Sequence, residues 1–378
     1  MHLAFLTSEY PHPRVQRSAG IGTSIKNLAN AYIGAGIEVS IFVYSAQEDA
    51  VFEEDGINFH LIKHQKFPFL GWYRYRKLIQ RYVNKQVVAS GIDAIEAADW
   101  TGITAFMNLK CPLVIRLHGT DAYFCHLEDR PQKKKNFFFE KKALQQADQI
   151  ITVSQFTAQV TKQLFGLNQS ITTLYNGVDI EKFKPNHTDQ RAGSLLYFGT
   201  VLRKKGVLEL AQAFNRVKEA FPEASLTFIG KDNPDIQQRQ STVAMCEELM
   251  SDAARASFTH IPHLPYEAIL THIAQAAVVV LPSFAEAFPM TWLESMAMEK
   301  ALVTSNIGWA HELMVPQKTG YTVTPTDHAA MANAIVALLQ NPELGVQMGR
   351  AARQRILDQF TAAAVADKNI AYFKNLTA

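Results

Sequence analysis

The chain has 378 residues, of which 48% are hydrophobic and 19% charged, and its formal net charge at pH 7 is +2. One hydrophobic core seldom supports this length, so we expect two domains. The balanced charge excludes binding to nucleic acid through overall charge, and no apolar run is long enough to cross a membrane. The three cysteines, Cys111, Cys125 and Cys246, form no Cys-x-x-Cys pair, which predicts reduced, buried thiols. The first residues lack the features of a signal peptide, so we expect a cytoplasmic protein.

The first half of the chain predicts a parallel sheet. A strand over residues 3–7, a loop containing Gly20 and Gly22, an amphipathic helix to about residue 35 and a strand over residues 39–43 form a β-α-β opening. Helical stretches then alternate with further segments that predict strands. This alternation favours a doubly wound sheet. The later strands are expected at residues 57–62, 94–96, 113–117 and 149–153.

A polar segment over residues 184–193 is the predicted linker between an N-terminal domain, residues 1–183, and a C-terminal domain, residues 194–361. The strand-helix alternation restarts after it, so we expect a second Rossmann-like domain. Ligands of such sheets bind outside the carboxyl ends of the strands. The second set of strands is expected at residues 194–198, 225–229, 256–261, 278–281 and 301–304.

Two carboxylates, Glu286 and Glu294, flank a predicted junction of strand, loop and helix. Pro289 suits the first position of that helix because its φ is fixed. Glu286 would lie at the carboxyl end of the strand, with Glu294 one to two turns into the helix. The free N–H groups of Met290 and Thr291 would favour an anion or a sugar hydroxyl. On spacing alone, an acidic helix start without a ligand is an equally good interpretation.

The chain around and after this helix resembles a known family. A Pro-Ser pair, the Glu-x7-Glu pair, a small-residue helix, a strand, a Gly/Glu loop and a Gly-x-x-Val-x-Pro-x-Asp segment follow one another. This order resembles the second half of retaining glycosyltransferases of family 4, also called group 1, with the GT-B fold. The resemblance implies two Rossmann-like domains facing across a cleft, with a last helix, residues 362–378, that crosses back onto the first domain. The matching pieces are Pro282-Ser283, Glu286 with Glu294, Ser295 to Ala297, Ala301 to Thr304, Gly308 with Glu312, and Gly320 to Asp327.

The segment from Gly199 to Gly206 resembles the family's Gly-Arg-Leu-x-x-x-Lys-Gly pattern. Lys205 matches the lysine that neutralises the departing pyrophosphate. Thr200 stands where the pattern has arginine, so Arg203 is our candidate for a second cation. A solvated basic turn is the alternative interpretation.

The resemblance implies further contacts with a sugar nucleotide. His118 matches a histidine that contacts the donor sugar, although a lone histidine at a strand end is more often structural. Glu286 would contact sugar hydroxyls, and Glu294 would accept hydrogen bonds from the ribose. The other expected donor-binding residues are Gly20, Gly22, Gly199, Thr200, Leu264 beside the nucleobase, Phe288, Met290 and Thr291.

The glycines at positions 20 and 22 precede a predicted helix, where N–H groups could bind a diphosphate. A structural turn explains two glycines equally well. A dinucleotide site requires G-x-G-x-x-G, but Ile25 stands at the last glycine position, and the second strand ends in Tyr44-Ser45 without an acid. These departures disfavour a nicotinamide cofactor.

We therefore expect a retaining glycosyltransferase that moves a sugar from a nucleoside-diphosphate sugar to a glycan or lipid-linked glycan, in the synthesis of cell-surface polysaccharide or lipopolysaccharide. No Asp-x-Asp pair occurs in the sequence, so we expect catalysis without a metal or other cofactor. Two alternatives remain open: a GT-B sugar-nucleotide epimerase and a non-catalytic protein that binds sugar nucleotides.

Residues 72–85 contain five basic residues and no acidic one. On a helix, Arg74, Lys77, Arg81 and Lys85 form one stripe beside an apolar stripe, which suits a membrane surface. Lys133 to Lys135, followed by three phenylalanines, add a second basic patch. We expect peripheral contact with an anionic bilayer at the inner face of the cell membrane. A solvated helix with its apolar stripe in the core is an equally good interpretation.

Overall fold

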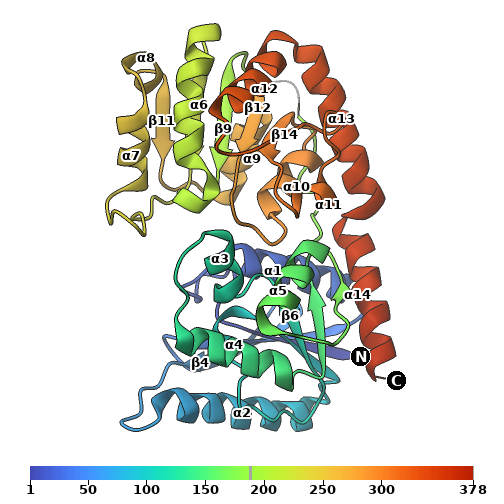
Figure 1. Cartoon of the computed structure of the whole chain (residues 1–378). Coiled ribbons are helices and arrows are strands. Elements are labelled where there is room, and N and C mark those ends of the chain that lie inside the picture. Colours follow the sequence, from blue (N-terminus) through green and yellow to red (C-terminus); the bar gives the residue numbers. More distant parts are fainter. Residues whose placement is uncertain (187–189, 378) are drawn as a thin grey trace. The chain divides into compact units, whose positions relative to one another are not determined.

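The computed structural model describes residues 1–186 and 190–377, so residues 187–189 of the predicted linker lie outside the described residues. The chain divides into two compact units. Unit 1 comprises Met1–Gly177 with Ala362–Ala378, and unit 2 comprises Val178–Thr361. The predicted last helix belongs to unit 1 (Figure 1). No helix of the described residues is long and apolar enough to span a bilayer.

Unit 1 contains an eight-stranded sheet in the order β3-β4-β2-β1-β5-β6-β7-β8. Its pairings are parallel except for β3 with β4, which form a hairpin that the sequence analysis missed. Asp55 and Gly56 connect them with φ values of 52° and 76°, the left-handed pair that a two-residue hairpin turn requires. The strands are β1 His2–Thr7, β2 Glu38–Ala46, β3 Ala50–Glu54, β4 Ile57–Lys63, β5 Ala94–Ala98, β6 Leu113–Leu117, β7 Gln149–Thr152 and β8 Thr172–Thr173.

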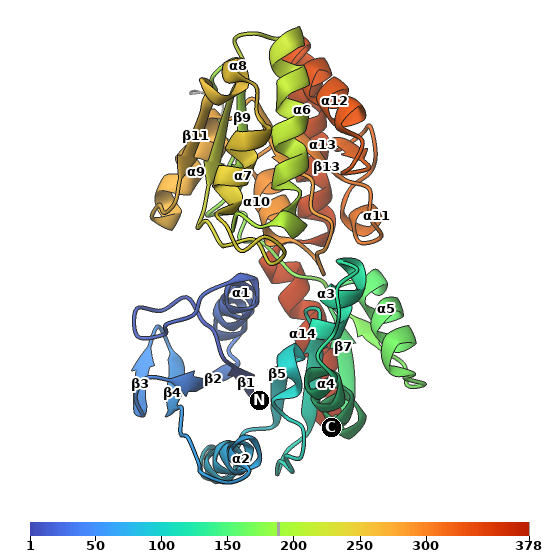
Figure 2. The ribbon, with the colours of Figure 1, turned by 60° about the vertical axis from the view of Figure 1, so that its left-hand side comes forward.

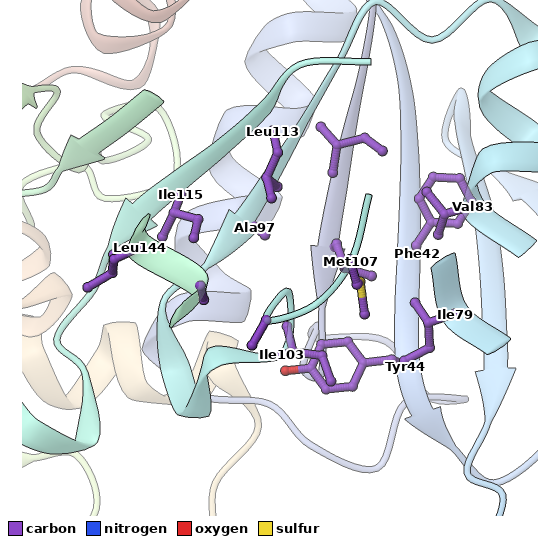
Figure 3. Packing of buried hydrophobic residues seen from close by; sticks show 14 of the residues in the cluster. Phe42, Tyr44, Ile79, Val83, Ala97, Ile103, Met107, Leu113, Ile115 and Leu144 are labelled. Carbon is purple, nitrogen blue, oxygen red and sulfur yellow. The ribbon is translucent and has the colours of Figure 1, made fainter. Parts of the chain in front are cut away.

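Helices cover both faces of this sheet, and each face has its own core. On one face, residues of α2 and α4 pack on the strands, as Ile79, Val83 and Leu144 do beside Phe42 and Ile115 (Figure 3). On the other face, α1 and α14 contribute apolar side chains. Figure 2 shows α1 and α2 on different sides of the strands. The helices of unit 1 are α1 Gly20–Gly34, α2 Gly71–Ser90, α3 Asp121–Leu127, α4 Lys134–Gln146, α5 Gln155–Phe165 and α14 Ala362–Thr377, with a 3₁₀ turn η1 over Trp100–Gly102.

A buried ion pair attaches the last helix to unit 1. The Arg116 guanidinium, on β6, donates to both carboxylate oxygens of Glu96 on β5, at 2.7 and 2.8 Å. It also donates to the Asn369 side-chain oxygen on α14 at 2.5 Å and to the carbonyl of Leu174 at 3.0 Å. Burial lowers the pKa of Arg116, and the Glu96 carboxylate reverses that effect and raises it.

Unit 2 contains a six-stranded sheet in the order β11-β10-β9-β12-β13-β14, and all its pairings are parallel. The five predicted strands are present, and β14 is an addition. The order reverses between β9 and β12, which makes their carboxyl ends the switch point of the sheet. The expectation of two doubly wound domains is confirmed. The strands are β9 Ser194–Phe198, β10 Ser225–Ile229, β11 Phe258–Ile261, β12 Val278–Leu281, β13 Leu302–Ser305 and β14 Tyr321–Val323.

The helices of unit 2 alternate with its strands, as a doubly wound sheet requires. They are α6 Val207–Ala220, α7 Thr242–Leu249, α8 Asp252–Arg255, α9 Tyr266–Gln275, α10 Met290–Ala297, α11 Ala310–Leu313, α12 His328–Gln340 and α13 Pro342–Gln359, with a 3₁₀ turn η2 over Arg203–Lys205.

Candidate functional site

The loops after β9 and β12 meet at the switch point of unit 2. Lys205, at the end of η2, donates to the Glu286 carboxylate with Nζ and Oε1 2.5 Å apart. The Ser283 hydroxyl donates to the same oxygen at 2.8 Å. The structure therefore brings together two of the predicted catalytic residues, from segments 81 residues apart in the sequence.

Close backbone contact fixes these two loops against each other. Gly206 has a φ of 72°, and a Cβ at this position would lie 2.1 Å from the carbonyl oxygen of Pro282. The N–H of Phe284 donates to the carbonyl of Lys204 at 2.8 Å. Only glycine fits such an approach with this backbone conformation, so Gly206 sets the position of the neighbouring Lys205.

Arg203, the candidate second cation, is bonded to a buried acid. Its Nε and Nη2 donate to the two carboxylate oxygens of Asp235 at 2.8 and 3.2 Å, and Asp235 is 2% exposed. The hydrogen bond from Arg203 lowers the pKa of Asp235. At position 200 the threonine carbonyl accepts a hydrogen bond from Tyr197 at 2.7 Å. The Arg203 charge is thus matched within unit 2, and its role towards a pyrophosphate stays a prediction.

Helix α10 begins at Met290, and Pro289 is its N-cap residue. Proline carries no side-chain acceptor, so Pro289 does not cap the first-turn N–H groups of Met290 and Thr291. Glu294 is 4% exposed and lies one turn further along the helix. Phe288 is buried with its ring centroid 5.5 Å from that of Phe360, so it contributes to packing within unit 2.

The remaining predicted donor-binding residues of unit 2 follow strand ends. Gly199, with a φ of 128°, comes directly after β9. A Cβ at Gly230 would lie 2.1 Å from the Gly199 carbonyl oxygen, so the ends of β9 and β10 are in close contact. Leu264 is half-buried in the loop after β11. Since all strands are parallel, these residues share one edge of the sheet with Lys205 and Glu286.

The predicted glycine loop of unit 1 is wrong in one detail. The helix begins at Gly20, so both glycines lie in its first turn rather than in a loop before it. The N–H of Gly22 donates to the Glu9 carboxylate at 2.9 Å, and a Cβ there would lie 3.1 Å from the Cα of Tyr10. One N–H group that we expected to face a diphosphate is therefore occupied by Glu9.

His118 comes directly after β6 and its side chain is half-buried. Its backbone N–H donates to Asp99 at 3.1 Å, whereas no hydrogen bond to its imidazole is found among the described residues. Burial, together with the positive charge of Arg116, lowers the pKa of His118 to about 3. The imidazole is therefore neutral at pH 7 and can give or accept a hydrogen bond, but it is a poor proton reservoir.

Two buried carboxylates near His118, Asp99 and Glu140, were missed by the sequence analysis. Burial raises the pKa of Asp99 to about 8 and that of Glu140 to about 7. Asp99 directly follows a predicted strand, and this position could have identified it as a candidate site residue. Glu140 lies within a basic helix, and no local sequence pattern identifies it.

The basic stripe on α2 is partly exposed. Arg74 and Arg81 are exposed, whereas Lys77 is half-buried and donates to the carbonyl of Phe106 at 2.6 Å. The neighbouring apolar stripe packs into the core, as Ile79 shows with 0% exposure. Large apolar side chains are nevertheless exposed close by: Phe69 (74%), Leu70 (63%) and Phe138 (55%).

No group of three or more His, Cys, Asp or Glu side chains within residues 1–186 and 190–377 is arranged to hold a metal ion. A hollow of about 450 Å³ lies at the start of α13, and no predicted site residue lines it. Its lining residues are Pro342, Glu343, Val346, Gln347 and Arg350.

Comparison with known proteins identifies relatives of both halves. The family model "Glycosyltransferase Family 4" matches residues 18–182, and the model "Glycosyl transferases group 1" matches residues 178–355. A glycogen synthase of Mycobacterium tuberculosis is 28% identical over 287 residues, which cover 72% of this chain and 66% of that protein. This chain thus spans about two thirds of the length of the glycogen synthase. An alpha-maltose-1-phosphate synthase of Mycolicibacterium smegmatis is 23% identical over 410 residues and covers 100% of both chains.

Solved structures share the fold. HepE of Anabaena, whose crystal structure is a complex with UDP-glucose, superposes with a TM-score of 0.76 at 16% identity over 99% of this chain and 100% of that one. Because the two family models cover consecutive segments that together span most of the sequence, the chain belongs to the GT-B glycosyltransferases of the family 4, group 1 type.

Proposed function

We propose that the protein is a retaining, metal-independent glycosyltransferase that moves a sugar from a nucleoside-diphosphate sugar to a glycan or lipid-linked glycan. The observation that carries the proposal is the Lys205–Glu286 pair at the switch point of unit 2, where α/β sheets bind their ligands. The relatives named as synthases of glycogen and maltose 1-phosphate, and the HepE complex with UDP-glucose, support a sugar nucleotide as donor.

The chemistry expected at this site is stabilisation of a leaving group. As the bond between sugar and diphosphate lengthens, negative charge accumulates on the pyrophosphate. The Lys205 ammonium and the uncapped N–H groups of Met290 and Thr291 are the groups that would stabilise it. Glu286, which holds Lys205, would accept hydrogen bonds from sugar hydroxyls, and neutral His118 would bond a further hydroxyl. The acceptor attacks from the side that the diphosphate leaves, which retains the anomeric configuration.

The donor assay separates this proposal from its alternatives. The protein is incubated with a panel of UDP-, GDP- and ADP-sugars, and release of nucleoside diphosphate is followed with and without maltooligosaccharides or a bacterial lipid-linked glycan extract. A transferase releases diphosphate faster with its acceptor and elongates it. An epimerase turns over without acceptor and yields an epimeric sugar. A binding protein retains the nucleotide and releases nothing, and either of these results refutes the proposal.

We further propose that the acceptor is reached at an anionic membrane, at the inner face of the cell membrane, as in the synthesis of surface polysaccharide or lipopolysaccharide. Exposed Arg74 and Arg81 lie on α2, and exposed Phe69 and Leu70 directly precede it. Cationic side chains beside exposed apolar ones suit the surface of an anionic bilayer, and their attraction weakens with salt.

Co-sedimentation with vesicles of phosphatidylglycerol and phosphatidylcholine across a salt series tests this attachment. Changing Arg74, Lys77 and Arg81 to serine should leave the protein in the supernatant at low salt, where the wild type pellets. The matched control changes three exposed basic residues of unit 2 to serine, and it should pellet like the wild type. Equal recovery of the wild type and of the variant at Arg74, Lys77 and Arg81 in the supernatant at low salt would favour a soluble acceptor. The control positions are Arg216, Lys318 and Arg350.

A further inference from the structure

A buried carboxylate holds the backbone of His118. Asp99, directly after β5, is 2% exposed. Its Oδ1 accepts the N–H of His118 at 3.1 Å, and its Oδ2 accepts the N–H of Gly119 at 3.1 Å. The loop after β6 is therefore fixed by a side chain that directly follows the neighbouring strand, β5.

A second buried carboxylate, Glu140 on α4, holds the continuation of the same loop. It is 0% exposed, and its Oε1 accepts the N–H of Asp121 at 2.8 Å while its Oε2 accepts that of Ala122 at 3.2 Å. The same Oε1 accepts the N–H of Thr101 at 3.3 Å, in the loop after β5. Glu140 thus connects the loop after β5 to the loop after β6.

Steric contacts leave these loops little freedom. Gly119 has a φ of 97°, and a Cβ there would lie 2.7 Å from the ring of Phe124. Gly102 has a φ of 58°, and a Cβ there would lie 2.3 Å from the backbone oxygen of Phe139 on α4. The Arg76 guanidinium donates to the Gly102 carbonyl at 3.1 Å.

Both carboxylates are costly to keep in the interior. Burial raises the pKa values of both, and repulsion adds to this effect: the Glu140 carboxylate raises the pKa of Asp99, and the Asp121 carboxylate raises that of Glu140. Yet each uses both of its oxygens as acceptors, which suits the ionised form. Buried acids with raised pKa values concentrate at functional sites.

We propose that Asp99 and Glu140 are positioning residues, which fix the backbone of residues 118–122 and thereby aim the His118 imidazole at the donor sugar. The half-buried imidazole has no hydrogen-bond partner among the described residues, and the hydrogen bond that holds this residue is the one from its backbone N–H to Asp99. This inference rests on the proposed function, because it assigns a role in the same transfer reaction.

The test compares Asp99→Asn and Glu140→Gln in the full chain. Each amide keeps the shape of the side chain but replaces one acceptor oxygen by a donor. Asp93→Asn is the matched control, because the half-buried Asp93 accepts a backbone N–H, that of His2 at 2.7 Å, at the amino end of the same sheet. Amide hydrogen exchange is measured for residues 99–103 and 118–122. Turnover is measured with the nucleotide sugar that the wild type uses fastest, and binding with its nucleoside diphosphate.

The two variants should exchange at least about tenfold faster in these loops, which corresponds to one weakened interaction of about 1.4 kcal/mol. Their kcat should fall at least about tenfold while the affinity for the nucleoside diphosphate, which unit 2 binds under the proposal, stays within about twofold. Asp93→Asn should change neither. If Asp99→Asn and Glu140→Gln leave the amide exchange of these loops unchanged, the inference is overturned. It is also overturned if exchange becomes faster but kcat stays like that of Asp93→Asn. If the wild type turns over no nucleotide sugar, the proposed function falls and the positioning role with it, while exchange still reports whether the carboxylates hold the loops.

Discussion

Replacing Glu96 by glutamine should destabilise unit 1 strongly. Arg116 is 0% exposed and Glu96 5% exposed, and they share two N–H···O bonds of 2.7 and 2.8 Å. In the variant, one acceptor oxygen becomes an NH₂ group that faces a guanidinium N–H. The buried positive charge then has no counter-charge, because its other partners, Leu174 and Asn369, offer neutral oxygens.

The expected loss follows from the burial of the pair. Removing one partner of a buried ion pair costs about 3–5 kcal/mol, since the remaining charge is uncompensated. This is a large share of the roughly 5–15 kcal/mol that stabilises a typical domain. Replacing both residues, Glu96→Leu with Arg116→Met, removes the charge as well. The double variant should lose only about 1–3 kcal/mol, mainly because the oxygens of Leu174 and Asn369 lose their donor.

Hydrogen exchange of the unit 1 strands in increasing urea measures these free energies without assuming that both units unfold together. Glu38→Gln is the control, because its side chain is 75% exposed on β2 of the same sheet, and it should change the free energy of unfolding by less than about 0.5 kcal/mol. A double variant no more stable than Glu96→Gln, or a single variant that loses less than about 1 kcal/mol, would refute the reasoning.

Three further outcomes are expected. Lys205→Ala should slow sugar transfer by a factor of roughly 10²–10³ while the fold stays intact. Glu294→Ala should mainly weaken donor binding, measured by titration. Near wild-type activity of either variant would contradict the assignment of this site. If Arg203 supplies the second cation, Arg203→Ala should lower kcat in steady-state kinetics nearly as much as Lys205→Ala does. Adding Thr200→Arg should then restore part of the activity. An Arg203→Ala variant with wild-type activity would show that Arg203 has no part in the mechanism. Burial lowers the pKa of Lys300 from 10.5 to about 8. Between pH 8 and 10.5 the unfolded chain therefore binds more protons than the folded protein. The free energy of unfolding should rise with pH across this interval, by up to about 3 kcal/mol. Thermal unfolding of Lys300→Met from pH 7.5 to 10 should lack this rise, and curves parallel to the wild type would show that the lysine is not the cause.

Local sequence patterns predicted most of the strands. They also predicted a helix start where a residue next to it in the sequence marks it. Apolar runs such as Val278 to Leu281 are buried parallel strands, and Pro289 marks the start of α10 to within one residue. The hairpin of β3 and β4 also has a local signal, because Asp55-Gly56 is a typical pair for a two-residue hairpin turn. The start of α1 at Gly20 was placed too late because no capping side chain marks it.

The pairings that shape the candidate site were not predictable in this way. Glu140 bonds Thr101, 39 residues earlier in the sequence, and Arg203 bonds Asp235, 32 residues later. Both contacts form only when folding has packed distant elements against each other, so the spacing of these residues in the sequence does not reveal them. The resemblance indicated that Lys205 and Glu286 act together, and their direct contact is a property of the folded sheet.

The attachment of α14 to unit 1 has a consequence for biosynthesis. Unit 2 is a continuous segment and can fold as soon as it has left the ribosome, whereas unit 1 needs its last helix. Arg116 precedes its partner Asn369 by 253 residues, a stretch that takes roughly 10–50 s to translate at 5–20 residues per second. During that interval α1 alone packs on this face of the first sheet, and the part that later receives Val365 and Phe373 is uncovered, so the nascent N-terminal half is a natural client for chaperones that shield apolar surface.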